Sequence, residues 1–277
     1  MRRHRALLLV VPMLVSLPAV TGCATERTGT TPRPATESMA AETPAADVIA
    51  DPTVDGRVAV GPHRLFIRCF GHGTPTIVLD AGDDSAGLDV FPASFIRPLA
   101  EQAMTCVYDR EGNGRSDPPS AKRRTIDDLV SDLHGLLAAP QVPEPYLLVG
   151  SSGGGLVDVH YAKVHPDQVA GLVLLDSGVP NAHLDREFPG AQGWRNPEHV
   201  DWVDAERRLA TLRMPIGDFP VLIVQADPGG EDETTDQSYW LALSPRARLR
   251  VMPGGHDLYQ ETPDAVASAV LATIKAG

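Results

Sequence analysis

The chain has 277 residues, of which 43% are hydrophobic and 22% are charged, and its formal net charge is −12. This composition is typical of a globular protein with enough apolar residues for one large core. The excess of acidic residues argues against binding to nucleic-acid phosphates, and it provides no attraction to an anionic membrane surface.

Residues 1–22 have the pattern of an export signal. Arginines lie close to the N-terminus, and an apolar stretch from Ala6 to Val20 follows them. This stretch is shorter than the roughly 20 residues that cross a bilayer as a helix. The sequence therefore predicts a cleaved signal peptide, and a permanent transmembrane anchor is the less favoured alternative.

The signal ends in Val20-Thr21-Gly22-Cys23, which resembles the lipobox of bacterial lipoproteins. The resemblance implies that Cys23 is acylated and that the protein is held at the outer face of the cell membrane. Without this modification the protein would be secreted. Residues 23–53 are rich in Thr, Pro, Ala and Glu and have no periodic apolar pattern, so we expect a disordered tether. Residues 54–277 are expected to form the folded domain.

Short apolar runs alternate with amphipathic stretches along this domain. The runs predict strands at 58–60, 65–70, 76–79, 105–108, 146–149, 169–175, 221–225 and 248–252. Helices are expected at 94–103, 126–138, 153–164 and 263–275. The alternation indicates a mostly parallel sheet with helices on both faces, preceded by an antiparallel hairpin. Residues 180–216 interrupt this alternation, so we expect a small helical cap there, containing Trp194 and Trp202.

The strongest chemical signal is Gly150-Ser151-Ser152-Gly153-Gly154, which follows an apolar strand and opens a helix. This is the G-x-S-x-G pattern of a nucleophile elbow, in which a tight turn between small residues exposes the serine hydroxyl. The alternative is a glycine-rich loop that holds phosphate, but the glycine and lysine spacing of such loops is missing here. Ser152 is therefore the predicted nucleophile, and Ser151 is out of frame with the glycines.

A serine nucleophile requires a general base, and His256 is the best candidate. It follows the last predicted strand in Gly254-Gly255-His256 and precedes the last helix. Most other histidines have ordinary structural interpretations: His160 and His165 lie at a predicted helix, and we expect the loop residues His63, His72, His183 and His199 to be solvated. The sequence contains neither an H-E-x-x-H motif nor a cluster of Cys and His, so no metal and no cofactor are expected.

The acid that orients the histidine has two candidates. Asp176 ends the strand after the elbow helix, and Asp227 follows the next strand. Both should lie at the carboxyl edge of the sheet, where active sites of α/β proteins form. An oxyanion hole needs two N–H donors. We expect these to be the backbone amides of Gly153, directly after the nucleophile, and of Asp83, in the loop after the first parallel strand.

These motifs together resemble the α/β-hydrolase fold of esterase-like serine hydrolases. The similar stretches include Leu65–Phe70, Thr74–Gly82, Val107–Asp117, Leu148–Gly154, Gly171–Asp176 and Gly255–Asp257. The resemblance implies an eight-stranded, mostly parallel sheet with a small cap, and catalytic roles for Ser152 and His256. It also favours Asp176 over Asp227 as the acid. In the strand order of this fold, the strands that carry Cys69 and Cys106 are neighbours, which implies a disulfide between them.

The predicted reaction is hydrolysis of a small carboxylic ester through an acyl-enzyme on Ser152. An iminopeptidase-like peptidase and a lactonase remain open as alternatives, as does a non-catalytic binding protein on the same fold. The predicted partner is a small-molecule substrate. No nucleic acid is expected, and membrane contact is expected only through a lipid anchor at Cys23.

Overall fold

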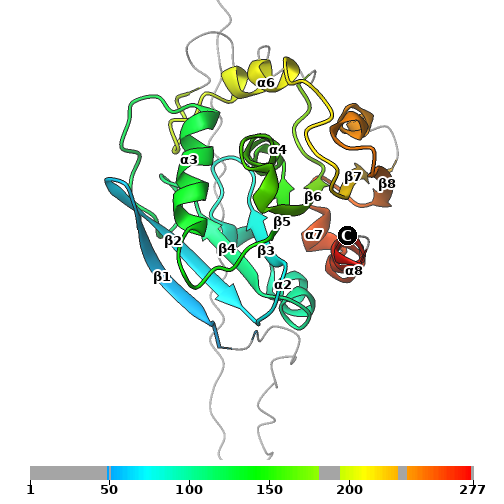
Figure 1. The fold of residues 1–277 in the computed structure, drawn as a ribbon, viewed down its shortest axis with the longest axis horizontal. Coiled ribbons are helices and arrows are strands. Elements are labelled where there is room, and N and C mark those ends of the chain that lie inside the picture. The colour runs from blue at the N-terminus through cyan, green and yellow to red at the C-terminus, as the bar shows by residue number, and fades with distance from the viewer. Residues whose placement is uncertain (1–48, 50, 181–193, 230–235, 276–277) are drawn as a thin grey trace, which may run out of the picture. The chain divides into compact units, whose positions relative to one another are not determined.

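The computed structural model describes residues 49, 51–180, 194–229 and 236–275. Its centre is one eight-stranded sheet with the order β1-β2-β4-β3-β5-β6-β7-β8 (Figure 1). Strand β2 is antiparallel to both of its neighbours, and all other neighbouring pairs are parallel. The strands are β1 (Val54–Val60), β2 (His63–Phe70), β3 (Thr76–Asp80), β4 (Thr105–Asp109), β5 (Tyr146–Ser151), β6 (Val169–Leu175), β7 (Val221–Asp227) and β8 (Ala247–Pro253). The predicted α/β-hydrolase sheet is confirmed.

Helices cover both faces of this sheet (Figure 1). One layer contains α3 (Ile126–Leu137) and α4 (Gly153–Val164), and α6 (Trp202–Ala210) packs against these two helices. The other layer contains α2 (Ala93–Ala100) and α8 (Pro263–Ile274). Two separate apolar clusters result. Leu133, Leu156 and Trp202 belong to the first, and Phe95, Leu99 and Val266 belong to the second. Strands β3 and β5, between the two layers, are buried at every residue, as expected for parallel strands.

Local sequence explains why several elements begin where they do. Helix α3 starts at a capping box in which the Thr125 side chain accepts from the Asp128 amide and the Asp128 side chain accepts from the Thr125 amide. Apolar side chains at helical spacing then bury one face of α3. Sequence periodicity predicted α2, α3, α4 and α8 to within a few residues, whereas α6 was expected only as part of a cap without bounds. It did not predict α1 (Gly87–Val90), α7 (Leu258–Glu261), or the 3-10 helices η2 (Pro166–Gln168) and η4 (Gln237–Leu243).

The predicted cap is described in part. Residues 181–193 lie outside the described residues, and residues 194–216 contain α6, whose N-cap Asp201 accepts from the Asp204 amide. The proposed signal peptide, Cys23 and most of the proposed tether also lie outside the described residues. No helix among the described residues is long and apolar enough to cross a membrane.

A disulfide links Cys69 on β2 to Cys106 on β4. The two residues are direct partners in the antiparallel register of these strands, and both are fully buried. The disulfide expected from the resemblance is therefore present.

Candidate active site

Ser152 lies at a sharp turn between β5 and α4. Its backbone has φ 50° and ψ −124°, a conformation that a residue with a side chain adopts only when its surroundings enforce it. The flanking glycines leave no room for a side chain. A Cβ on Gly150 would lie 2.5 Å from Gly155 Cα, and one on Gly154 would lie 2.4 Å from Ala81 O. Ser151 is buried at the end of β5. The predicted elbow geometry is thus formed around Ser152.

His256 follows β8 and hydrogen bonds to Asp176. Its Nδ1 lies 2.7 Å from Asp176 Oδ2, and the other oxygen, Asp176 Oδ1, accepts from the Ala226 amide at 3.1 Å. Asp176 itself has a positive φ of 42° at the end of β6. Asp227, at the end of the neighbouring strand, instead accepts from the Gly229 amide at 3.1 Å. Of the two acids that the sequence offered, the structure places Asp176 against the histidine.

The surroundings of His256 favour its protonated form. The hydrogen bond to Asp176 raises the pKa of the imidazole above its usual value, and this effect outweighs burial, which acts in the opposite direction. The carboxylates of Asp257 and Asp83 also raise this pKa through their charge. The imidazole therefore needs a higher pH than usual to become neutral, the form in which it can accept a proton.

A cavity of about 290 Å³ lies at the carboxyl edge of the sheet. Its lining includes Ser152, His256, Gly82, Asp83, Asp257 and Tyr259. Larger hollows lie elsewhere, and the largest of these is lined by residues at the opposite edge of the sheet, away from Ser152 and His256. We assign the candidate site from its chemistry, because this cavity brings the predicted nucleophile and base together.

The loop after β3 packs directly against the elbow. A Cβ on Gly82 would lie 3.3 Å from Ser152 Cβ, and one on Gly153 would lie 2.5 Å from Asp83 Oδ1. The backbones of Asp83 and Gly153, the two expected oxyanion donors, are therefore on neighbouring segments beside Ser152. A side chain at Gly82 or Gly153 would therefore require its neighbour to shift.

A buried arginine holds this loop in place, and the sequence analysis missed its role. Arg110 Nη1 donates to Ala81 O at 2.6 Å, and Nη2 donates to Gly82 O at 2.5 Å. The same guanidinium pairs with Asp80 at 2.5 Å and with both oxygens of Glu198 at 2.8 and 2.9 Å. Its two carboxylate partners are fully buried. The available sequence signal was a charged residue directly after a buried strand, but its partner Glu198 is 88 residues away.

Two buried acids beneath the site have perturbed pKa values. Burial raises the pKa of Asp80 to about 6, although Arg110 and a hydrogen bond from Tyr108 lower it. Asp158, on α4, lies under the elbow, since a Cβ on Gly150 would meet its Oδ2 at 2.6 Å. Neither carboxyl oxygen of Asp158 has a hydrogen-bond partner among the described residues, and burial raises its pKa well above the usual value. Burial therefore favours the protonated, neutral form of Asp158.

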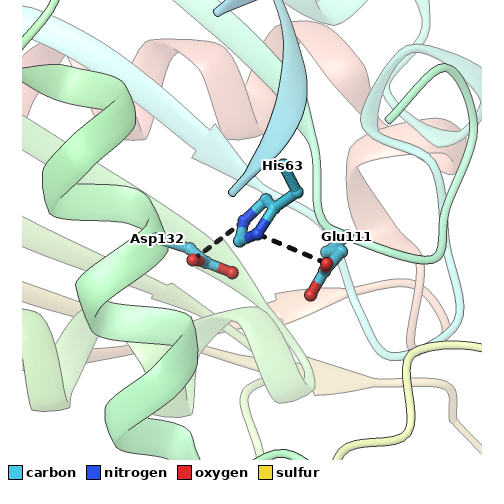
Figure 2. Close-up of side chains that lie close together, drawn as sticks. All are labelled: His63, Glu111 and Asp132. Atoms are coloured by element: carbon cyan, nitrogen blue, oxygen red, sulfur yellow. Dashed lines mark ion pairs between the residues drawn. The ribbon is translucent and has the colours of Figure 1, made fainter. Parts of the chain in front are cut away.

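A second group of titratable side chains lies between the β1-β2 hairpin and α3. Figure 2 shows the His63 ring between Asp132 and Glu111, with nitrogen-to-oxygen distances of 3.0 and 3.4 Å. His63 was interpreted from the sequence as a solvated loop residue, which is wrong: it begins β2, and 10% of its side chain is exposed. Arg124 pairs with both carboxylates. The guanidinium contacts the second oxygen of each carboxylate and supplies positive charge beside both, so we interpret the group as an ion-pair network.

Comparison with known proteins agrees with this architecture. Residues 69–197 match the family model described as "alpha/beta hydrolase fold". An uncharacterized protein of Bacillus subtilis, YqjL, is 24% identical over 79% of this chain and 88% of its own length. Lipase LipV of Mycobacterium tuberculosis is 41% identical over 43% of this chain and 44% of its own length. The chain thus spans less than half of that lipase.

Solved structures show the same fold at low sequence identity. A thermophilic esterase from Thermogutta terrifontis superimposes with a TM-score of 0.64 and 20% identity, covering 82% of this chain and 98% of that one. Matching proteins also carry names of esterases, iminopeptidases and lactonases, so the comparisons do not single out one substrate. Together, the sheet order, the matching segment and the similar structures show that this chain has the α/β-hydrolase fold and that its relatives include hydrolases.

Proposed function

We propose that this protein is a serine hydrolase that cleaves a small carboxylic ester through an acyl-enzyme on Ser152. The observation that carries the proposal is the meeting of Ser152, at its strained turn, with the Asp176-bound His256 in one cavity. His256 would take the hydroxyl proton as Oγ attacks the carbonyl, then give it to the leaving alcohol. It would next activate water to release the acid.

The remaining residues have supporting roles in this scheme. Asp176 would hold the imidazole in position and stabilise its protonated form. The amides of Gly153 and Asp83 would donate to the oxyanion that forms on the carbonyl oxygen. Arg110 would fix the second of these donors through its bonds to the carbonyls of Ala81 and Gly82. No metal or cofactor has a role in this scheme.

We also propose that the protein acts outside the cytoplasm. Two features support export, namely the signal-like residues 1–22 and the disulfide between Cys69 and Cys106, since disulfides persist in oxidising compartments. Acylation of Cys23 would then anchor it to the membrane. Intact-mass analysis of protein from the membrane fraction tests this point, and a Cys23→Ala variant should lose the acyl mass.

The test of the reaction is active-site labelling of residues 24–277 with a fluorophosphonate, alongside p-nitrophenyl acetate hydrolysis. One adduct per chain on Ser152 and ester turnover, both lost in Ser152→Ala, are the expected results. A folded protein that neither labels nor turns over the ester would contradict the proposal and favour a binding role.

A further inference from the structure

Two carboxylates lie in the wall of the cavity that contains Ser152 and His256. Asp83 is half-buried in the loop after β3, and Asp257 is exposed directly after the histidine. Among the described residues, no lysine or arginine lines this cavity, and neither carboxylate has an ion pair with a lysine or arginine side chain. A negatively charged wall of this kind attracts a cationic ligand and repels an anionic one.

The side chain of Asp83 lies unusually close to the reacting groups. Its Oδ1 is 2.5 Å from the position that a Cβ on Gly153 would occupy, so the carboxylate packs against the residue that follows the nucleophile. The negative charges of Asp83 and Asp257 also reach His256, since both raise the pKa of its imidazole. An acidic group at this position would oppose the negative charge that develops on the substrate oxygen.

The nearby arginine cannot neutralise this wall. Arg110 is 4% exposed, and its charge is already matched by the buried carboxylates of Asp80 and Glu198. A second acid of the same loop, Asp84, has its pKa raised to about 6 by burial and by the charges of Glu198 and Asp83. Excess negative charge therefore remains on the substrate side of the loop, where a substrate cation would compensate it.

We infer that the preferred substrate carries a cationic, ammonium-type group, held by Asp83 and Asp257 while Ser152 attacks the ester carbonyl. This inference rests on the proposed serine hydrolase function and specifies its substrate class. A substrate cation next to Asp83 would remove the opposition to the oxyanion, so the preference should be larger in kcat/KM than in binding alone.

The test compares two nearly isosteric esters. One is the p-nitrophenyl ester of γ-trimethylammonio-butyric acid, and the other is its uncharged analogue, in which a tert-butyl group replaces the trimethylammonium group. The expected kcat/KM ratio is about tenfold or more in favour of the cationic ester at low salt. The ratio should fall as ionic strength rises, because salt screens the interaction. The p-nitrophenyl half-ester of glutaric acid should be the poorest substrate.

Two isosteric variants test whether Asp83 and Asp257 cause the preference for the cationic ester. Asp83→Asn and Asp257→Asn should each reduce the ratio of cationic to neutral kcat/KM, a quantity that does not depend on the amount of active enzyme. Asp167→Asn is the matched control, because Asp167 is an exposed acid before β6, at the opposite edge of the sheet. It should leave the ratio and the basal rates unchanged. If one variant fails to fold, the other still tests the assignment, and the salt dependence of the native protein measures the electrostatic part of the preference.

Failure of the cation preference and failure of the hydrolase function would give different results. Neutral ester turnover with a ratio near one, or a ratio that neither substitution changes, would overturn the inference and leave the hydrolase intact. Absence of both turnover and labelling of Ser152 would overturn the hydrolase itself and the inference with it.

Discussion

Asp176 and His256 are joined by a hydrogen bond of 2.7 Å, although they are 80 residues apart in the chain. The Ala226 amide fixes the other oxygen of Asp176, so this carboxylate presents one oxygen to the imidazole. Asp227 is oriented toward its own turn through Gly229. If Asp176 is the acid of a triad, Asp176→Asn should lower kcat by about 10⁴-fold. Asp227→Asn should leave kcat little changed, and the opposite pattern would reassign the acid. Both rates are measured with p-nitrophenyl acetate.

The pH dependence of activity should reflect the raised pKa of His256. Because the base acts when neutral, the acid limb of kcat/KM should have its midpoint above the ordinary histidine value of 6.5. Asp257→Asn removes one charge that raises this pKa, so the midpoint should move to lower pH. A midpoint below 6.5 in the native protein would contradict this account.

The raised pKa of His256 also affects stability. The contribution of the protonated imidazole to the free energy of unfolding is fully present below the unfolded-state pKa and is lost as pH rises through the folded-state pKa.

Arg110 should be important for stability as well as for the loop. Arg110→Met leaves Asp80 and Glu198 buried without their cation, and we expect a loss of about 3–5 kcal/mol in the free energy of unfolding. Arg208→Met is a suitable control, because Arg208 also pairs with two carboxylates but is 44% exposed. It should cost about 0–1 kcal/mol. Urea unfolding measures both values, and equal losses would contradict the difference assigned to burial.

Asp158 should make stability fall as pH rises. Its folded-state pKa lies above its unfolded value near 3.8, so the folded protein binds one extra proton between the two values. Stability therefore decreases with pH across that window. Asp158→Asn removes the titrating group, and its advantage over the native protein should grow as pH increases from about 4. Denaturation midpoints at several pH values measure this difference. A flat difference for Asp158→Asn would show that its pKa is not raised.

The disulfide should contribute substantially to stability. Cys69 and Cys106 are 37 residues apart, for which chain-entropy arguments give about 4 kcal/mol. The double variant Cys69→Ala, Cys106→Ala should lose about this amount in guanidinium unfolding under non-reducing conditions. Reductant should have no further effect on the variant. Equal stability of the native protein with and without reductant, with reduction verified by mass, would contradict the prediction.

Sequence patterns predicted the framework well because periodicity and turn chemistry act over short distances. Helix α4 and strand β6 have the predicted bounds, and Gly150 to Gly154 form the predicted turn. The four-residue helices α1 and α7 were not predicted, because one turn shows no periodicity. The choice between Asp176 and Asp227 could not be made from spacing, since both follow parallel strands. It depends on which carboxylate the loop of His256 reaches.

Ion-pair partners that are far apart in the chain could not be predicted from the sequence, because local patterns carry no information about them. Glu198 lies outside the sheet, and nothing in its neighbourhood indicates that Arg110 is its partner. The position of His63 ahead of the predicted strand 65–70 suggested a solvated loop residue. Its burial results from contacts with Glu111 and Asp132, which belong to two other segments of the chain. Such contacts depend on the packing of α3 and the loops above the sheet.

The disulfide between β2 and β4 also limits how far strands can be pulled from the β1 side of the sheet. Strand β1 is the outermost strand, and its first residue, Val54, pairs with Cys69. A force on the chain ahead of β1 could strip that strand residue by residue. The extension would stop at the covalent link, because β2 cannot separate from β4 while the sulfur atoms are joined. Strand β5, which leads into the turn of Ser152 and lies four strands further in than β1, would be shielded from such a load.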